Sequence, residues 1–201
     1  ISTNLRLMKM RSLMTLGKYD ESKKEIDHIL KDKSAKNINA NELIYYKLLI
    51  RSRSGKIKDA GMEVKGLKAN KPFYQNALAE YGKILTDLGQ NTKAIKILSE
   101  ALRNGVLDPD IHYKLGLSFY GIDDLVNAKE HIKKAYQSMP DHPLYAYALS
   151  TVLFYMNDHE NALSIMLNSY NKIPDDGKKD NLLGNIYMAQ GIIDEAQKFY
   201  Y

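Results

Sequence analysis

Small residues recur at one fixed spacing through most of this sequence. Five alanines share one phase of that spacing: Ala60, Ala94, Ala128, Ala162 and Ala196. Glycines and prolines repeat with the same period in other phases: Gly82, Gly116 and Gly184; Gly55, Gly89 and Gly191; Pro72, Pro140 and Pro174; Pro109 and Pro143. A long, constant period of this kind is typical of a solenoid, in which each repeat is one hairpin of helices that packs only on its neighbours. The spacing therefore predicts one elongated array of repeats.

The repeat is clearest between Pro109 and Pro140, where two amphipathic helices are expected. The first carries Leu115, Gly116 and Phe119 on one face, and the second carries Leu125, Ala128, Ile132 and Ala135 at helical spacing. Gly116 and Ala128 fall where the helices would cross, and small residues there allow a close approach of the two backbones. Asp123 and Asp124 lie between the helices and can cap the second one.

This pattern resembles the tetratricopeptide repeat family. Leu183, Gly184 and Tyr187 match the family's first helix, and Ala128, Ile132, Ala135 and Pro140 match its second helix. The resemblance covers nearly the whole chain and implies an all-α, right-handed α-solenoid of about six helical hairpins. We expect a single solenoid over residues 1–201, with units at about 3–36, 41–74, 75–108, 109–142, 143–176 and 177–201, the last one incomplete.

The first two units depart from the pattern. Lys9-Met10 and Lys47-Leu48 stand where Leu-Gly would be, and the phase slips by four residues between these units. Gly61 and Gly66 fall inside the expected second helix of the second unit, where each costs about 1 kcal/mol relative to alanine. We expect this helix to be the weakest. The sequence ends inside an expected helix with Phe199, Tyr200 and Tyr201, whereas the last unit of a solenoid needs a polar outer face. We therefore expect more chain to follow; the alternative is that this end packs on a partner subunit.

Charge is distributed unevenly along the chain. Residues 1–70 contain 16 Lys and Arg against 8 Asp and Glu, and residues 71–201 contain 13 against 16, so the net charge of +5 is the sum of +8 and −3. A basic end can meet nucleic acid, anionic lipid or an acidic protein. The basic residues alternate with acidic ones, as on a solvated helix, and aromatic side chains are not interleaved as base stacking requires. A nucleic-acid-binding adaptor therefore stays an alternative only.

The sequence contains no motif for catalysis, cofactor binding or metal binding. It has no cysteine, which excludes disulfides and thiolate metal sites. It has no GxxxxGKS/T or GxGxxG motif, and its five histidines form no HExxH or other pair with metal spacing. No apolar run reaches the roughly 18–20 residues of a membrane span, so membrane contact is expected only through an anchor outside this chain. We expect a non-enzymatic protein without cofactor or metal.

The resemblance also implies a binding surface. In tetratricopeptide folds the first helices of successive repeats line a concave groove that binds peptide segments. Carried over by position, the groove would include Tyr45, Leu49, Lys83, Tyr113, Leu117, Tyr120, Tyr147, Thr151, Phe154, Tyr155, Asn181 and Asn185. Arg11, Met14 and Arg53 fall at further groove positions of the first two units. The aromatic members are expected to support binding rather than the core, and an aromatic, apolar groove suits an apolar or helical partner segment.

These expectations describe a protein-interaction scaffold or assembly factor. The alternative is a regulatory or substrate-presenting region of a larger enzyme. Asn181-Leu182-Leu183-Gly184 through Ala196 also look like the repeat lipoproteins of bacterial tight-adherence (Tad) pilus systems, whose family role is assembly of the outer-membrane secretin. The lipid-bearing cysteine with which such proteins start is not in this chain. This second resemblance implies the periplasmic face of the outer membrane; without it we expect the cytoplasm.

Overall fold

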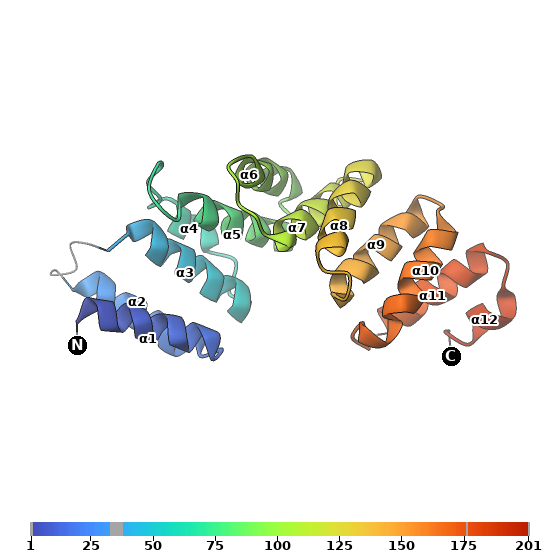
Figure 1. The fold of residues 1–201 in the computed structure, drawn as a ribbon, viewed down its shortest axis with the longest axis horizontal. Helices are drawn as coiled ribbons and strands as arrows, with labels where there is room; N and C mark the ends of the chain where they lie inside the picture. The colour runs from blue at the N-terminus through green and yellow to red at the C-terminus, as the bar shows by residue number, and fades with distance from the viewer. Residues whose placement is uncertain (1, 33–37, 176, 201) are drawn as a thin grey trace. The chain divides into compact units, whose positions relative to one another are not determined.

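The computed structural model describes residues 2–32, 38–175 and 177–200, which form helices, turns and loops and contain no strand. In chain order the helices are α1 (Thr3–Thr15), α2 (Tyr19–Lys31), α3 (Ala40–Ser54), α4 (Ala60–Val64), α5 (Tyr74–Asp87), α6 (Asn91–Arg103), α7 (Pro109–Tyr120), α8 (Leu125–Ser138), α9 (Pro143–Tyr155), α10 (His159–Ser169), the 3-10 turn η1 (Tyr170–Lys172), α11 (Lys178–Ala189) and α12 (Ile193–Gln197) (Figure 1). They follow one another in the chain as successive helical hairpins.

The repeat period is visible in the backbone of the hairpin turns. One residue between the two helices of each hairpin has a positive φ: Gly17 (72°), Gly55 (71°), Gly89 (70°), Asp123 (61°), Asn157 (61°) and Gly191 (75°). From Gly55 onward these positions are each one full period apart, like the alanines from Ala60 to Ala196. Glycine adopts this conformation freely, and Asp and Asn tolerate it better than other side chains do. The repeat therefore keeps its turn conformation even where the glycine is replaced.

Two further positions of each hairpin are buried. On the first helices they are Met10, Leu48, Gly82, Gly116, Ser150 and Gly184. On the second helices they are Ser22, Ala60, Ala94, Ala128, Ala162 and Ala196, all 0 % exposed. A Cβ added at Gly116 would lie 2.4 Å from Cγ1 of Ile132 and 3.1 Å from the carbonyl oxygen of Ala128, which confirms that α7 and α8 cross closely there. In the first hairpin the Ser22 hydroxyl donates to the Met10 carbonyl oxygen over 3.1 Å.

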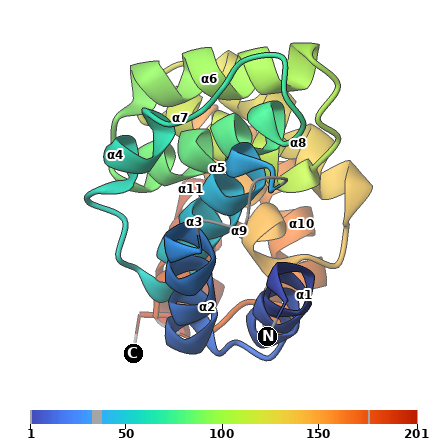
Figure 2. The ribbon, with the colours of Figure 1, turned by 90° about the vertical axis from the view of Figure 1, so that its left-hand side faces the viewer.

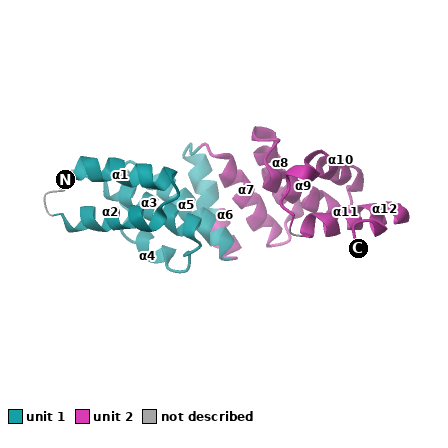
Figure 3. Ribbon diagram, turned by 90° about the horizontal axis from the view of Figure 1, so that it is seen from below, with its two compact units in different colours: residues 1–88, 96–106 teal, residues 89–95, 107–201 magenta. Residues whose placement is uncertain are grey.

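The described residues group into two compact units (Figure 3). Unit 1 comprises residues 1–88 and 96–106, and unit 2 comprises residues 89–95 and 107–201, so α6 contributes to both. In unit 1, α2 contacts both α1 and α3, and α3 packs against α4 and α5. Figure 2 views the chain from the side on which α1 and the N-terminus lie. In unit 2, α9 contacts α7, α8, α10 and α11. The first helices α3 and α5 thus pack together in unit 1, and in unit 2 α9 packs against both α7 and α11.

The two units differ in how their cores are built. In unit 2 one apolar cluster runs from Ala128 on α8 to Ile186 on α11. In unit 1 the buried residues form separate clusters, one around Met10 and Ile26 and one around Leu48 and Ile84. None of the described helices is both long and apolar enough to span a membrane. Among these same residues, no group of three or more His, Cys, Asp or Glu side chains could hold a metal ion.

Helix α4 is the second helix of its hairpin and the one that the sequence predicted to be the weakest, and it is short. It spans five residues, contains Gly61, and ends before Gly66. The chain that follows α4 is hydrogen-bonded to Asn41, which is 1 % exposed. The Asn41 side-chain amide donates to the Lys68 carbonyl oxygen over 2.8 Å and accepts from the Lys68 amide over 2.9 Å. One buried side chain thus makes two hydrogen bonds to the backbone of the segment that follows α4.

We therefore expect residues 58–70 to open more readily than residues 125–138 of α8. Local opening is easiest where apolar contacts and helical hydrogen bonds are few. Native-state hydrogen exchange should show faster exchange over 58–70, with the Lys68 amide as a protected exception because it donates to buried Asn41. Equal protection of the two segments would contradict this account of unit 1.

Candidate functional site

Five aromatic residues at predicted groove positions lie on α7 and α9: Tyr113, Tyr120, Tyr147, Phe154 and Tyr155, hereafter the aromatic cluster. The ring centroids of Tyr120 and Tyr155 are 5.9 Å apart, and those of Phe154 and Tyr155 are 5.4 Å apart. Tyr113 packs instead against buried Tyr145, with centroids 4.9 Å apart. The structure thus brings the rings of Tyr120, Phe154 and Tyr155 together across two adjacent first helices.

The aromatic cluster is partly surface and partly core. Tyr155 is 56 % exposed. The other four side chains are half-buried and pack against the apolar core of unit 2. The expectation that these rings support binding and not the core is therefore too simple, because removing any of the four would also remove core contacts. Tyr155 is the member whose truncation should leave the core nearly intact.

The Tyr120 hydroxyl group of the aromatic cluster is uncharged at physiological pH. Burial, and then the neighbouring Tyr155 hydroxyl, raise the pKa of Tyr120 to about 12. Thr151, another predicted groove residue, donates its hydroxyl to the Tyr147 carbonyl oxygen over 2.8 Å. The α7–α9 surface therefore presents aromatic rings with a neutral hydroxyl at Tyr120, which suits a partner segment with large apolar side chains.

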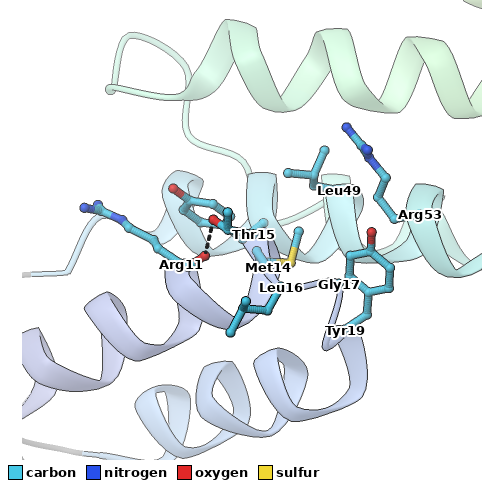
Figure 4. Close-up of a pocket in the computed structure, with 9 residues that line it drawn as sticks. Arg11, Met14, Thr15, Leu16, Gly17, Tyr19, Leu49 and Arg53 are labelled. Carbon is cyan, nitrogen blue, oxygen red and sulfur yellow. Dashed lines mark hydrogen bonds between the residues drawn. The ribbon is translucent and has the colours of Figure 1, made fainter.

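A pocket of about 640 Å³ lies on the first helices of unit 1 (Figure 4). It is lined by Arg11, Met14, Thr15, Leu16, Gly17, Tyr19, Tyr46, Leu49 and Arg53, hereafter the α1–α3 pocket. Four of these were placed in the groove from the sequence: Arg11, Met14, Leu49 and Arg53. The residues that the sequence missed include Leu16, Gly17 and Tyr19, which lie at the turn and at the start of α2 rather than on a first helix.

The remaining predicted groove residues have other surroundings. Tyr45 packs against the rings of Tyr46 and Phe73, with centroids 5.2 and 5.9 Å away. Lys83 is paired with Glu80 over 3.2 Å, and its side chain is only 13 % exposed. Leu117 is half-buried against the core of unit 2, and Asn181 and Asn185 are exposed on α11. Lys83 is thus occupied by an internal ion pair, whereas the two asparagines lie at the surface.

A histidine pair between α7 and α8 was not indicated by any sequence motif. The Nδ1 atoms of His112 and His131 are 2.9 Å apart, within hydrogen-bonding distance. The Phe119 ring stacks on His131 with centroids 5.5 Å apart. Burial, then His112 and Lys134, lower the pKa of His131 to about 4, while nearby Glu130 opposes this shift. Burial and Lys134 also lower the pKa of His112.

This pair predicts that unit 2 loses stability as the pH falls from about 6.5 to about 4. In that window the unfolded histidines, with a pKa near 6.5, bind protons that the folded pair does not bind. The free energy of unfolding therefore decreases toward acid. Urea titrations between pH 4.5 and 7 should show this slope, and His131→Gln should flatten it. An unchanged slope in His131→Gln would exclude the pair as its cause.

No family model and no curated protein sequence matches the chain. Solved structures do match. A structure of pilF of Pseudomonas aeruginosa superposes with a TM-score of 0.78 and 16 % identity, covering 98 % of this chain and 88 % of that one. A structure of MamA superposes with a TM-score of 0.68 and 20 % identity, covering 80 % of this chain and 88 % of the MamA chain. At these identities the likeness shows the fold, and the predicted all-helical tetratricopeptide solenoid class is confirmed.

Proposed function

We propose that this chain is a non-enzymatic scaffold that holds a segment of a partner protein against the aromatic cluster. The observation that carries the proposal is the set of rings from α7 and α9, with Tyr155 56 % exposed at its surface. Aromatic side chains are enriched at the energetic centres of protein interfaces, because they bury a large area with few rotatable bonds. An exposed ring supported by half-buried rings is suited to this role.

The chemistry of the cluster favours an apolar or helical partner segment with large side chains. Burial raises the pKa of Tyr120 to about 12, so its hydroxyl carries no charge that would attract a strongly ionic ligand. The resemblance of Asn181 to Ala196 to Tad repeat lipoproteins supports pilus or secretin assembly as the setting. We include that setting in the proposal, with the partner as a protein of the assembled machine.

Site-specific photo-crosslinking tests the proposal. The photoreactive residue p-benzoylphenylalanine would replace Tyr155 on α9, or, as a control, Val126 on α8, which is 66 % exposed in the same unit. In cells that express the full protein, irradiation should crosslink one partner from position 155 and not from position 126. Sequencing of the crosslinked peptide should return an apolar segment. Equal crosslinking from both positions, or crosslinking from 126 alone, would contradict the proposal.

A further inference from the structure

The α1–α3 pocket has an arginine at each end and apolar side chains between them. Figure 4 shows Met14 and Leu49 between Arg11 and Arg53, which lie toward opposite sides. The rings of Tyr19 and Tyr46 complete the lining. A volume of about 640 Å³ falls within the roughly 300–1,000 Å³ of ordinary ligand sites, enough for two or three side chains of a bound segment.

The two arginines differ in their charge balance. The Arg11 guanidinium is ion-paired with Glu42, whose side chain is mostly buried, so this end of the pocket is neutral. Arg53 is exposed and makes no ion pair with any side chain in the described ranges. The pocket therefore carries one uncompensated positive charge beside an apolar surface. A carboxylate can bond a guanidinium through two parallel hydrogen bonds, which is stronger than a bond between neutral groups.

We propose that the α1–α3 pocket binds an acidic segment of a protein partner, with one carboxylate on Arg53 and an adjacent apolar side chain against Met14 and Leu49. The net charge of +8 over residues 1–70 would speed the encounter with such a segment. This site lies within unit 1 and does not rest on the aromatic cluster, which lies within unit 2.

A nucleic acid fits the pocket less well than an acidic peptide. Binding along a phosphate backbone draws its strength from several cations that each neutralise a phosphate. The lining offers one uncompensated arginine, and apolar Met14 and Leu49 lie between the two arginines. An acidic protein segment can satisfy both features with two neighbouring side chains.

Fluorescence anisotropy with designed peptides tests this inference. The probe is a fluorescein-labelled nonapeptide with one glutamate between two leucines in a Gly/Ser frame; its twins carry glutamine or lysine instead of glutamate. Wild-type protein should bind the glutamate peptide about tenfold more tightly than the glutamine twin, which corresponds to about 1.4 kcal/mol. Arg53→Glu should abolish that preference and bind the lysine twin best. Thermal unfolding should be unchanged, because Arg53 is exposed.

Two control variants make the test specific. Arg103→Glu makes the same charge change at another exposed arginine of unit 1, outside the pocket lining, and should keep the glutamate preference. Tyr155→Ala removes an aromatic-cluster side chain and should also keep it, which separates this site from the proposed function. The inference is overturned by no saturable binding of the glutamate peptide or by no preference over glutamine. The inference is also overturned if Arg103→Glu loses the glutamate preference as fully as Arg53→Glu does. A labelled DNA duplex that outcompetes the peptide would overturn it as well.

Discussion

Gly116→Ala is expected to lower the free energy of unfolding of unit 2 by about 1–3 kcal/mol through overpacking. The added Cβ would lie 2.4 Å from Cγ1 of Ile132, which a rotamer change could relieve. It would also lie 3.0 Å from the Ile132 backbone nitrogen, which moves only if α7 and α8 separate. The gain of about 1 kcal/mol in helix propensity cannot offset that separation fully. Urea unfolding followed by circular dichroism measures the loss.

The matched control is Gly61→Ala on α4. Its Cβ would lie 3.3 Å from the Tyr81 hydroxyl oxygen, the far end of a side chain that can move away. Stability should therefore stay constant or rise slightly. Ala128→Leu fills the same crossing from α8 and should cost about 1–3 kcal/mol as well. Wild-type stability in both Gly116→Ala and Ala128→Leu would mean that the helices do not need small residues at this crossing.

Truncation of the aromatic cluster is expected to weaken binding of the crosslinked partner segment about 30-fold, equivalent to about 2 kcal/mol. The double variant Tyr147→Ala, Phe154→Ala removes two half-buried rings. Because these rings also pack on the core of unit 2, the variant should lose stability too. Tyr155→Ala should lose affinity with little loss of stability, since Tyr155 is 56 % exposed. Isothermal titration calorimetry and thermal unfolding separate the two effects.

Tyr136→Ala on α8 is the control for lost core packing. Tyr136 is half-buried against the same core but lies outside the aromatic cluster. It should lose stability and keep full affinity. If Tyr136→Ala lost as much affinity as the double variant, the binding defect would reflect loosening of unit 2. If Tyr155→Ala kept full affinity, the binding surface would lie elsewhere.

The repeat positions could be predicted from the sequence because a constant period specifies which residues are equivalent. The buried alanines such as Ala128 and Ala162 follow directly from it. The same period contains Asp123 and Asn157 at the turn position of Gly55, but their positive φ becomes evident only in the structure. Residue identity suggested that Asp123 and Asp124 can cap α8, and it is Asp124 that accepts from the Asn127 amide over 3.1 Å.

The sites were less predictable, because periodicity specifies a face of a helix and not the depth of a side chain. It placed Tyr147 and Phe154 on the first helix of their hairpin, but it did not indicate that both side chains pack against the core of unit 2. It could not indicate that Lys83 is ion-paired with Glu80 whereas Arg53 is exposed, because ion pairs depend on side-chain positions. The contact between His112 and His131 likewise joins two helices and follows no sequence motif.

Hydrogen–deuterium exchange of the protein with and without the crosslinked partner segment tests the central claim most directly. Binding at the aromatic cluster should slow amide exchange over residues 113–120 of α7 and 147–155 of α9. Exchange over 125–138 of α8 and 159–169 of α10, the second helices of the same hairpins, should change little. Protection confined to α8 and α10, or to unit 1, would contradict the account.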